Sequence, residues 1–394
     1  MPTSTLFTVA ALMMLPAMLF ASYPLLLLAL SRLAPFRDAS PPGHGDDASD
    51  TCTRPSFALI TVAGRQDARL ERKLEELARL AEHGGAAEVL VGLDGGTAPP
   101  ASNPPLEWIA VMPAEGKNAV LRRLHATAQA DVLVFSDTDA QVEPESLDAL
   151  LEPFSDATIG AVTGRRRIVD GTRFGKGQAG YSDFEECIRR LEMRCLGSVT
   201  SCEGKLYAIR RSLVGELPEE VTDDLYTGLG AVAAGKRLVS EPTAIARVGR
   251  PARDIHHDLE RRRRVTCRGL ATLWHRRALL DPARHGRYAV ALFTNKLLRR
   301  LAAPCTLLAL VATSIGAALS PTLGLLIGVV LAACAAVLVT LARLLGKGAA
   351  LTYLVLGTIG MALGVLDYLR GRRVRHWEPR KQDPTPVPES GDGR

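Results

Sequence analysis

Two acidic side chains, Asp137 and Asp139, stand one residue apart directly after the apolar run DVLVFS at residues 131–136. A second short apolar run, residues 88–93, is followed in the same way by Asp94. Carboxylate oxygens are the ligands that Mg²⁺ and Mn²⁺ prefer, and proteins commonly share these ions with substrate phosphates. The spacing therefore predicts a divalent-cation site. The alternative is that these aspartates only form turns or cap the next helix.

Strand-like and helix-like segments alternate around these aspartates. Leucines at positions 70, 74, 77 and 80 have helical spacing, and Gly84-Gly85 then gives a helix stop signal. The predicted strands are 57–62, 88–93, 107–111 and 131–136, and the predicted helices are 67–83 and 117–129. This alternation predicts an α/β fold with a mostly parallel sheet and helices on both faces, with ligands bound at the carboxyl ends of the strands. No GxGxxG follows the first strand, which argues against a dinucleotide site.

Two long apolar regions flank this part of the chain. Leu6 to Leu30 contains no charged residue, and Leu301 to Leu366 is nearly as apolar. A helix that spans a bilayer needs about 20 such residues. The predicted organisation is a transmembrane anchor (1–31), a linker (32–54), a cytoplasmic domain (55–284), an interfacial amphipathic segment (285–300), three transmembrane helices (301–369) and a basic, partly disordered tail (370–394).

The distribution of positive charge predicts the orientation. Arg32 and Arg37 follow the first apolar run, which favours a cytoplasmic middle domain, whereas three further spans would put the basic tail outside. The first run lacks a basic segment before it and an A-x-A cleavage site, so we expect an uncleaved anchor.

Charge indicates the kind of partner, and cysteine content indicates the compartment. The net charge is +6, and arginines cluster beside the apolar regions, where lipid headgroups rather than nucleic acid are the expected partners. The seven cysteines form no CxxC pair, which argues against a zinc ribbon or a disulfide framework and suits a reducing compartment.

Several motifs stand in a recognisable order. They are GLDGG (92–96), EGKNAVLRRL (115–124), FSDTDAQVEPESL (135–147), CEGKLYAIRRSL (202–213), VTDDLYTGLGAVAAGKRLV (221–239) and ERRRRVTCRGL (260–270). From about Phe57 to Trp377 the chain resembles the membrane-bound family 2 glycosyltransferases, the group that includes hyaluronan, chitin, cellulose and poly-N-acetylglucosamine synthases. The resemblance implies a glycosyltransferase-A fold for residues 55–284, a nucleotide-sugar donor and inversion at the anomeric carbon.

The same resemblance assigns donor-side residues. Asp94 falls on the nucleotide-contacting aspartate and Lys117 on the lysine that meets the donor. Asp137 and Asp139 fall on the DxD motif, which implies that Asp139, with Asp137, holds Mg²⁺ or Mn²⁺ against the donor diphosphate.

The resemblance also assigns residues on the acceptor side. The catalytic base falls on one of two adjacent acids, with Asp224 the first choice and Asp223 the alternative. Arg264 falls on the arginine that would contact the leaving diphosphate, although a basic run near a membrane is also typical of headgroup contact. Arg261 and Val265 replace the Gln and Trp of the family's motif, which favours transfer of one or few sugars.

The expected function is therefore an inverting, metal-dependent hexosyltransferase of the plasma membrane, multi-pass, with its catalytic domain in the cytoplasm. It would move a sugar, most often from a UDP-sugar, to a lipid-linked or polysaccharide acceptor in exopolysaccharide or glycolipid biosynthesis. One alternative is a processive synthase that also extrudes its polymer. Another, of a different class, is a non-catalytic membrane subunit, which retention of all the acids argues against.

Overall fold

The computed structural model describes residues 23–36, 54–64, 68–95, 106–111, 114–170, 172–249, 255–305 and 348–372, with a few isolated positions between 311 and 322. The strands are β1 Phe57–Ala63, β2 Glu88–Asp94, β3 Leu106–Val111, β4 Val132–Ser136, β5 Ala140–Val142, β6 Ile159–Ile168, β7 Leu206–Arg210 and β8 Arg237–Val248. The helices are α2 Ala68–Gly84, α3 Lys117–Thr127, α4 Pro144–Leu151, α5 Arg173–Leu196, α6 Asp223–Ala233, α7 Ile255–His275, α8 Pro282–Leu292 and α11 Gly348–Leu369, and Phe293–Leu298 is a π-helical turn. These bounds confirm the predicted strands and helices to within two residues.

The strands form one sheet in the order β3-β2-β1-β4-β7-β6-β8-β5. Strands β1, β2, β3 and β4 pair in parallel, as predicted. Strand β7 runs antiparallel to both of its neighbours, β4 and β6, and β5 is antiparallel to β8. The sheet is therefore mixed, and the reversed β7 brings the start of one strand beside the carboxyl end of another.

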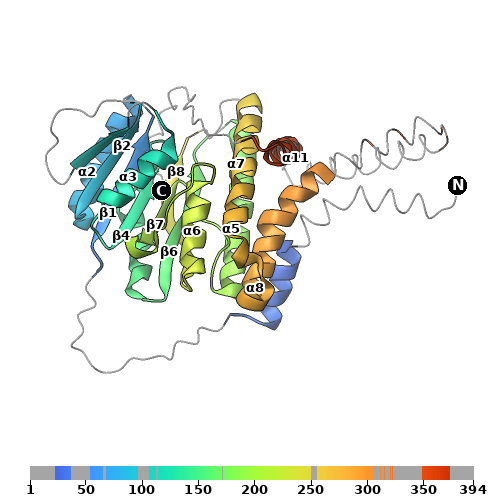
Figure 1. Cartoon of the computed structure of the whole chain (residues 1–394), viewed down its shortest axis with the longest axis horizontal. Helices are drawn as coiled ribbons and strands as arrows, with labels where there is room; N and C mark the ends of the chain where they lie inside the picture. The colour runs from blue at the N-terminus through green and yellow to red at the C-terminus, as the bar shows by residue number, and fades with distance from the viewer. Residues whose placement is uncertain are drawn as a thin grey trace, which may run out of the picture.

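Helices cover both faces of the sheet, as Figure 1 shows for α2, α3 and α6. Leu77 of α2 and Leu147 of α4 share one apolar core with β1, and Val120 and Leu124 of α3 share the other with β1 and β4. Every residue of β1 and of β4 is buried, which explains why both strands read as continuous apolar runs in the sequence.

A group of helices packs beside the sheet domain, at the right of Figure 1. The helical residues 23–33 contact α5 and α8 through Tyr23 and Leu27, which share a buried cluster with Ile188 and Ala291. The predicted interfacial segment, 285–300, falls on α8 and the π-helical turn, and both Asn295 and Lys296 of that turn are buried.

The predicted transmembrane segments receive no support from the structure. Over the described ranges given above, no helix is long and apolar enough to cross a membrane. Most of the predicted anchor (residues 1–22) and most of residues 306–347 lie outside those ranges, as do most of the linker and the tail beyond residue 372.

Candidate active site

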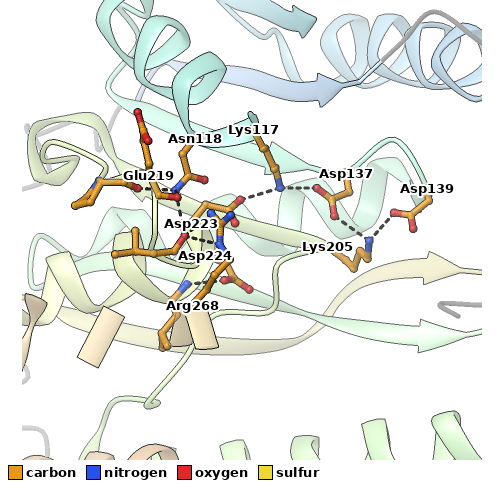
Figure 2. A network of polar contacts seen from close by, with 12 residues as sticks. Lys117, Asn118, Asp137, Asp139, Lys205, Glu219, Asp223, Asp224 and Arg268 are labelled. Atoms are coloured by element: carbon orange, nitrogen blue, oxygen red, sulfur yellow. Dashed lines mark hydrogen bonds and ion pairs between the residues drawn. The ribbon is translucent and has the colours of Figure 1, made fainter. Parts of the chain in front are cut away.

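The two aspartates of the DxD motif face one cationic group. Asp137 and Asp139 follow β4, and Lys205 immediately precedes β7, which pairs antiparallel with β4. The Lys205 Nζ lies 2.8 Å from Asp137 Oδ2 and 2.6 Å from Asp139 Oδ1. Figure 2 shows both carboxylates turned toward this ammonium. The two acids converge on one cationic group, and their predicted binding of a divalent cation stays a prediction.

Lys117 joins this pair to the second pair of acids. It is the first residue of α3, and its Nζ lies 3.0 Å from Asp137 Oδ1 and 2.7 Å from Asp223 Oδ2. A lysine at a helix N-terminus is disfavoured by the helix dipole, so the neighbouring carboxylates must compensate. The predicted donor-side lysine therefore lies between the two acidic motifs, as Figure 2 shows.

Asp94 holds the turn that presents Lys117. Its carboxylate accepts hydrogen bonds from the backbone N–H groups of Glu115, at 2.9 Å, and Gly116, at 3.0 and 3.1 Å. Gly116 has φ of 98°, in the region that favours glycine, so the turn depends on that residue type. Asp94 thus positions Lys117, and its predicted contact with the nucleoside stays a prediction.

Asp223 and Asp224 open α6, where acidic side chains are stabilised by the helix dipole. The loop before them is held from two sides. Asn118 Nδ2 donates to the carbonyl oxygens of Pro218, at 2.7 Å, and Val221, at 3.1 Å. The Arg268 guanidinium donates to the same Val221 carbonyl from α7.

The two adjacent acids differ in their surroundings. Asp223 is ion-paired with Lys117, whereas the Oδ1 of Asp224 accepts from the Leu225 backbone N–H at 2.7 Å. Burial, together with the neighbouring charge of Asp223, raises the pKa of Asp224 to about 7. Asp224 can therefore both gain and lose a proton near neutral pH.

The lysines and Asp137 are fixed in their charged forms. Burial alone would raise the pKa of Asp137, but Lys117 and Lys205 outweigh it and hold that pKa well below its usual range. Burial alone would lower the pKa of each lysine, but the facing aspartates raise both pKa values above the ordinary lysine value. The donor side of the site is therefore a cluster of permanent charges.

A buried ion pair supports the DxD loop from beneath. Lys73 of α2 lies 2.6 Å from Glu76 and also donates to Ser136 Oγ, at 2.7 Å, and to the carbonyl oxygen of Ala140, at 2.9 Å. These two acceptors are on either side of the DxD motif. The Lys73 side chain is 1% exposed, so this contact fixes the loop in a desolvated environment.

Three arginines of the run in α7 form ion pairs within the fold, and the predicted contact of Arg264 with the leaving diphosphate stays a prediction. Arg261 and Arg262 pair with Asp258 in their own helix, and Arg263 pairs with Asp367 of α11. Arg264 is mostly buried beside the other arginines, and burial followed by the charge of Arg268 lowers its pKa. Arg268, one helical turn further on, is the residue that reaches the loop before the acid pair.

Residues that the sequence analysis missed therefore complete the site. Lys205, Arg268, Asn118 and Lys73 carried no assigned role, although each lies in a segment that was singled out. The sequence could have indicated a buried ion pair at Lys73, because a lysine among the leucines of an apolar helix face needs a buried partner.

A family profile described as Glycosyltransferase like family 2 matches residues 55–267, more than half of the chain. The chain belongs to this family. It is a glycosyltransferase that uses a nucleotide-sugar donor. A search of curated proteins found no match.

Solved structures similar to this glycosyltransferase include the mannosyltransferase PcManGT from Pyrobaculum calidifontis, in complex with GDP-Man and Mn²⁺. It is 20% identical, with a TM-score of 0.67, and the match covers 92% of this chain and 99% of that one. Glucosyl-3-phosphoglycerate synthase from Mycobacterium tuberculosis is 16% identical, with a TM-score of 0.38, over 55% of this chain and 78% of that one. The first likeness shows a shared fold, which is the predicted glycosyltransferase-A type.

The donor set of the glycosyltransferase suits a divalent cation. Two carboxylates from the DxD loop converge on one position that a cationic group already takes, and Mg²⁺ typically binds one or two carboxylates together with substrate phosphates. Over the described ranges no group of three or more His, Cys, Asp or Glu side chains is placed to hold a metal. Asp137 and Asp139 are therefore the ligands that the chain would contribute.

Proposed function

We propose that this protein is an inverting, metal-dependent glycosyltransferase that moves a sugar from a nucleotide-sugar donor to a membrane-associated glycan or lipid. The observation that carries the proposal is the placement of Asp224 beside an ion-paired Asp223, at the edge where the DxD carboxylates converge. Exopolysaccharide or glycolipid biosynthesis is the setting that we infer.

Asp224 is the general base in this proposal. Inversion requires one base to accept the proton of the acceptor hydroxyl as that oxygen attacks the anomeric carbon. A carboxylate with a pKa of about 7 is well matched to that task at neutral pH. Asp223 is engaged with Lys117, so its charge orients the lysine rather than serving the proton transfer.

The donor side neutralises the leaving group. Asp137 and Asp139 would hold Mg²⁺ or Mn²⁺, and such an ion supplies positive charge that offsets the charge growing on the departing diphosphate. Lys117 adds a fixed ammonium at the same edge, and the turn held by Asp94 keeps it there. Arg268 lies close enough to Asp223 and Asp224 to interact electrostatically with both carboxylates. We infer that Arg268 and Arg264 border the diphosphate.

A pocket between α7 and the end of α11, with basic and aromatic side chains in its lining, supports an acceptor site. It has a volume of about 190 Å³ and is lined by residues that include Arg268, Trp274, His275, Tyr368 and Arg372. Aromatic faces cover sugar rings with large contact area, and arginine forks match phosphate oxygens. We infer that a lipid-linked or polysaccharide acceptor approaches from this pocket.

The membrane assignment rests on the sequence. The apolar runs at 6–30 and 301–366 are long enough for spans, and we propose a multi-pass protein of the plasma membrane with the catalytic domain in the cytoplasm. Membrane lipids would then be partners of the protein.

The test is a donor screen. Purified full-length protein in detergent is incubated with UDP- and GDP-sugars and Mn²⁺ or Mg²⁺, and release of the nucleoside diphosphate is measured. We expect release with one donor class, UDP-sugars first, and its loss in Asp139→Asn. No release with any donor, or equal release by the variant, would contradict the proposal.

Product length separates this proposal from a processive synthase. Val265, which is 43% exposed, takes the position at which processive members carry a tryptophan, so we expect one to a few sugars per acceptor. A membrane assay with radiolabelled donor measures this. A ladder of high molecular mass without released intermediates would favour the processive alternative.

A further inference from the structure

Lys205 lies where a divalent cation bound by the DxD motif would have to lie. Its Nζ is 2.8 Å from Asp137 and 2.6 Å from Asp139, and the three side chains are 15%, 28% and 12% exposed in that order. An ammonium ion and a metal ion cannot share two carboxylates at such distances, because their like charges repel strongly in a partly desolvated site. Binding of the cation therefore requires the ammonium to move.

The backbone that carries Lys205 is held in place, so the movement belongs to the side chain. The Glu203 backbone N–H donates to Thr163 Oγ1 at 2.6 Å, and the Glu203 carboxylate lies 3.7 Å from Arg166. Gly204 lies against Asp224, since a Cβ at this glycine would be 2.6 Å from Asp224 Oδ2. The four-carbon stem of a lysine can swing while this segment stays still.

The displaced ammonium needs a new anion in the same neighbourhood. Asp137 keeps a cationic neighbour in Lys117, which binds its other carboxylate oxygen at 3.0 Å. When the cation binds, the Lys205 ammonium gives up its contacts with the Asp137 and Asp139 carboxylates and needs the anion that accompanies the cation as its new partner. A nucleoside diphosphate brings that anion, because its phosphate oxygens bind the cation and a lysine at the same time.

Resting on the proposed function, we propose that Lys205 is an internal competitor for the donor's cation, which makes cation binding depend on the nucleotide diphosphate. Without nucleotide, the ammonium closes the Asp137–Asp139 pair against divalent ions. With nucleotide, the ammonium moves to the diphosphate and the carboxylates accept the ion. Lys205 is thus a positioning residue that couples the two ligands, and thermodynamic coupling of this kind is reciprocal.

The test measures Mn²⁺ binding rather than turnover. The fraction of free Mn²⁺ is followed by electron paramagnetic resonance, with isothermal titration calorimetry as a second readout, for the full-length protein with and without UDP or GDP. In the wild type we expect the nucleotide to strengthen Mn²⁺ binding about tenfold or more, within the usual range of coupling between sites. In Lys205→Met we expect Mn²⁺ alone to bind about tenfold more tightly, with a smaller effect of nucleotide.

Two further variants control the experiment. Lys205→Arg keeps the positive charge and should retain the nucleotide dependence. Lys236→Met removes a lysine whose Nζ donates to the Ala157 carbonyl oxygen far from the motif, and should behave as the wild type. Circular dichroism of each variant checks folding.

The outcomes separate the two proposals. Equal affinity of the wild type and Lys205→Met for Mn²⁺ without nucleotide overturns the role of Lys205, while nucleotide-dependent binding in both would leave the proposed function standing. If neither protein binds a nucleoside diphosphate or Mn²⁺ under any condition, the proposed function and this role fail together.

Discussion

Two polar networks of this glycosyltransferase are built in opposite ways. At the donor edge, Lys117 and Lys205 meet Asp137, Asp139 and Asp223, and these side chains are 12–28% exposed. Here the ammonium groups of flexible lysine side chains contact carboxylates, and a charged ligand can replace one of these partners. A network of this kind is able to rearrange when a substrate arrives.

The second network surrounds Glu192 of α5, which is 1% exposed. Its carboxylate accepts from the Tyr23 hydroxyl at 2.6 Å, the Asn295 amide at 2.9 Å, and both the backbone N–H and the hydroxyl of Thr200, at 2.9 and 2.8 Å. These donors come from the helical residues 23–33, the segment after α5 and the π-helical turn. Short, neutral donors satisfy this buried carboxylate and hold three distant segments together. The network at the donor edge can exchange its partners, whereas the network around Glu192, called the buried joint below, keeps them.

The largest effect on transfer should come from Asp224, which adjoins the donor-edge network next to Asp223. We expect Asp224→Asn to slow transfer about 10²–10⁴-fold, because a general base is lost, while donor binding changes little. Burial raises the pKa of Asp224 in the folded state, so ionisation of this group opposes folding above its ordinary pKa. The melting temperature of the variant should therefore be unchanged or higher at pH 8.

Steady-state kinetics and nucleotide titration check this expectation. The matched control is Asp223→Asn, which removes a partner of Lys117 instead. If Asp223→Asn loses transfer with intact donor binding and Asp224→Asn does not, the roles within the pair are reversed.

The next effect belongs to the buried joint. Glu192→Gln replaces an acceptor oxygen with a donor amide against donors from Tyr23, Thr200 and Asn295, so at least one buried group loses its partner. We expect the free energy of unfolding to fall by about 1–3 kcal/mol, with transfer per folded molecule unchanged. Thermal unfolding measures the loss, and the exposed Glu82→Gln is the control. A loss of transfer without a loss of stability would contradict the distinction between the networks.

The pH dependence of transfer sharpens the same distinction. Because burial and Asp223 raise the pKa of Asp224 to about 7, the carboxyl keeps its proton at pH 6 and cannot act as a base, whereas it is ionised at pH 8. Transfer should rise with pH to a midpoint near 7, and fall about tenfold for each unit well below it. In Asp223→Asn the midpoint should move down, since a neighbouring negative charge is gone. A rate that stays flat between pH 5 and 9 would exclude Asp224 as the base.

The smallest effect should come from Thr200→Val. This change keeps the backbone N–H bond to Glu192 and removes the hydroxyl, which both donates to Glu192 and accepts from Asn295 at 2.9 Å. We expect a loss of about 0.5–1.5 kcal/mol in stability, measured as for Glu192→Gln, and wild-type kinetics. A greater loss than that of Glu192→Gln would mean that the hydroxyl, not the carboxylate, organises the joint.

The sequence predicted the parts of the molecule that depend on local pattern. Strands β1 and β4 are buried on both faces and so appear as apolar runs, and the acids after β4 follow from the rule that ligands bind at carboxyl ends. Asp223 and Asp224 were found through motif order, and the structure separates the pair by the contact with Lys117.

The rest depends on contacts between distant segments. Lys205 was not predicted because nothing in the spacing shows that β7 runs antiparallel beside β4. Arg268 was missed because the motif pointed one helical turn earlier, to Arg264. The joint around Glu192 combines residues near positions 23, 200 and 295, which no periodicity connects.

The reversed strand β7 also sets the order in which the site can come into being during synthesis. Asp137 leaves the ribosome 68 residues before Lys205, and at about 5–20 residues per second that interval lasts several seconds. During it, Asp137 and Asp139 lack the cation that the finished fold gives them, and the pairing that supplies it is non-local and therefore slow to form. The complete charge network of the site thus exists only after β7 and α6 have docked, and a nascent or truncated chain that ends before them lacks Lys205 and both acids of α6.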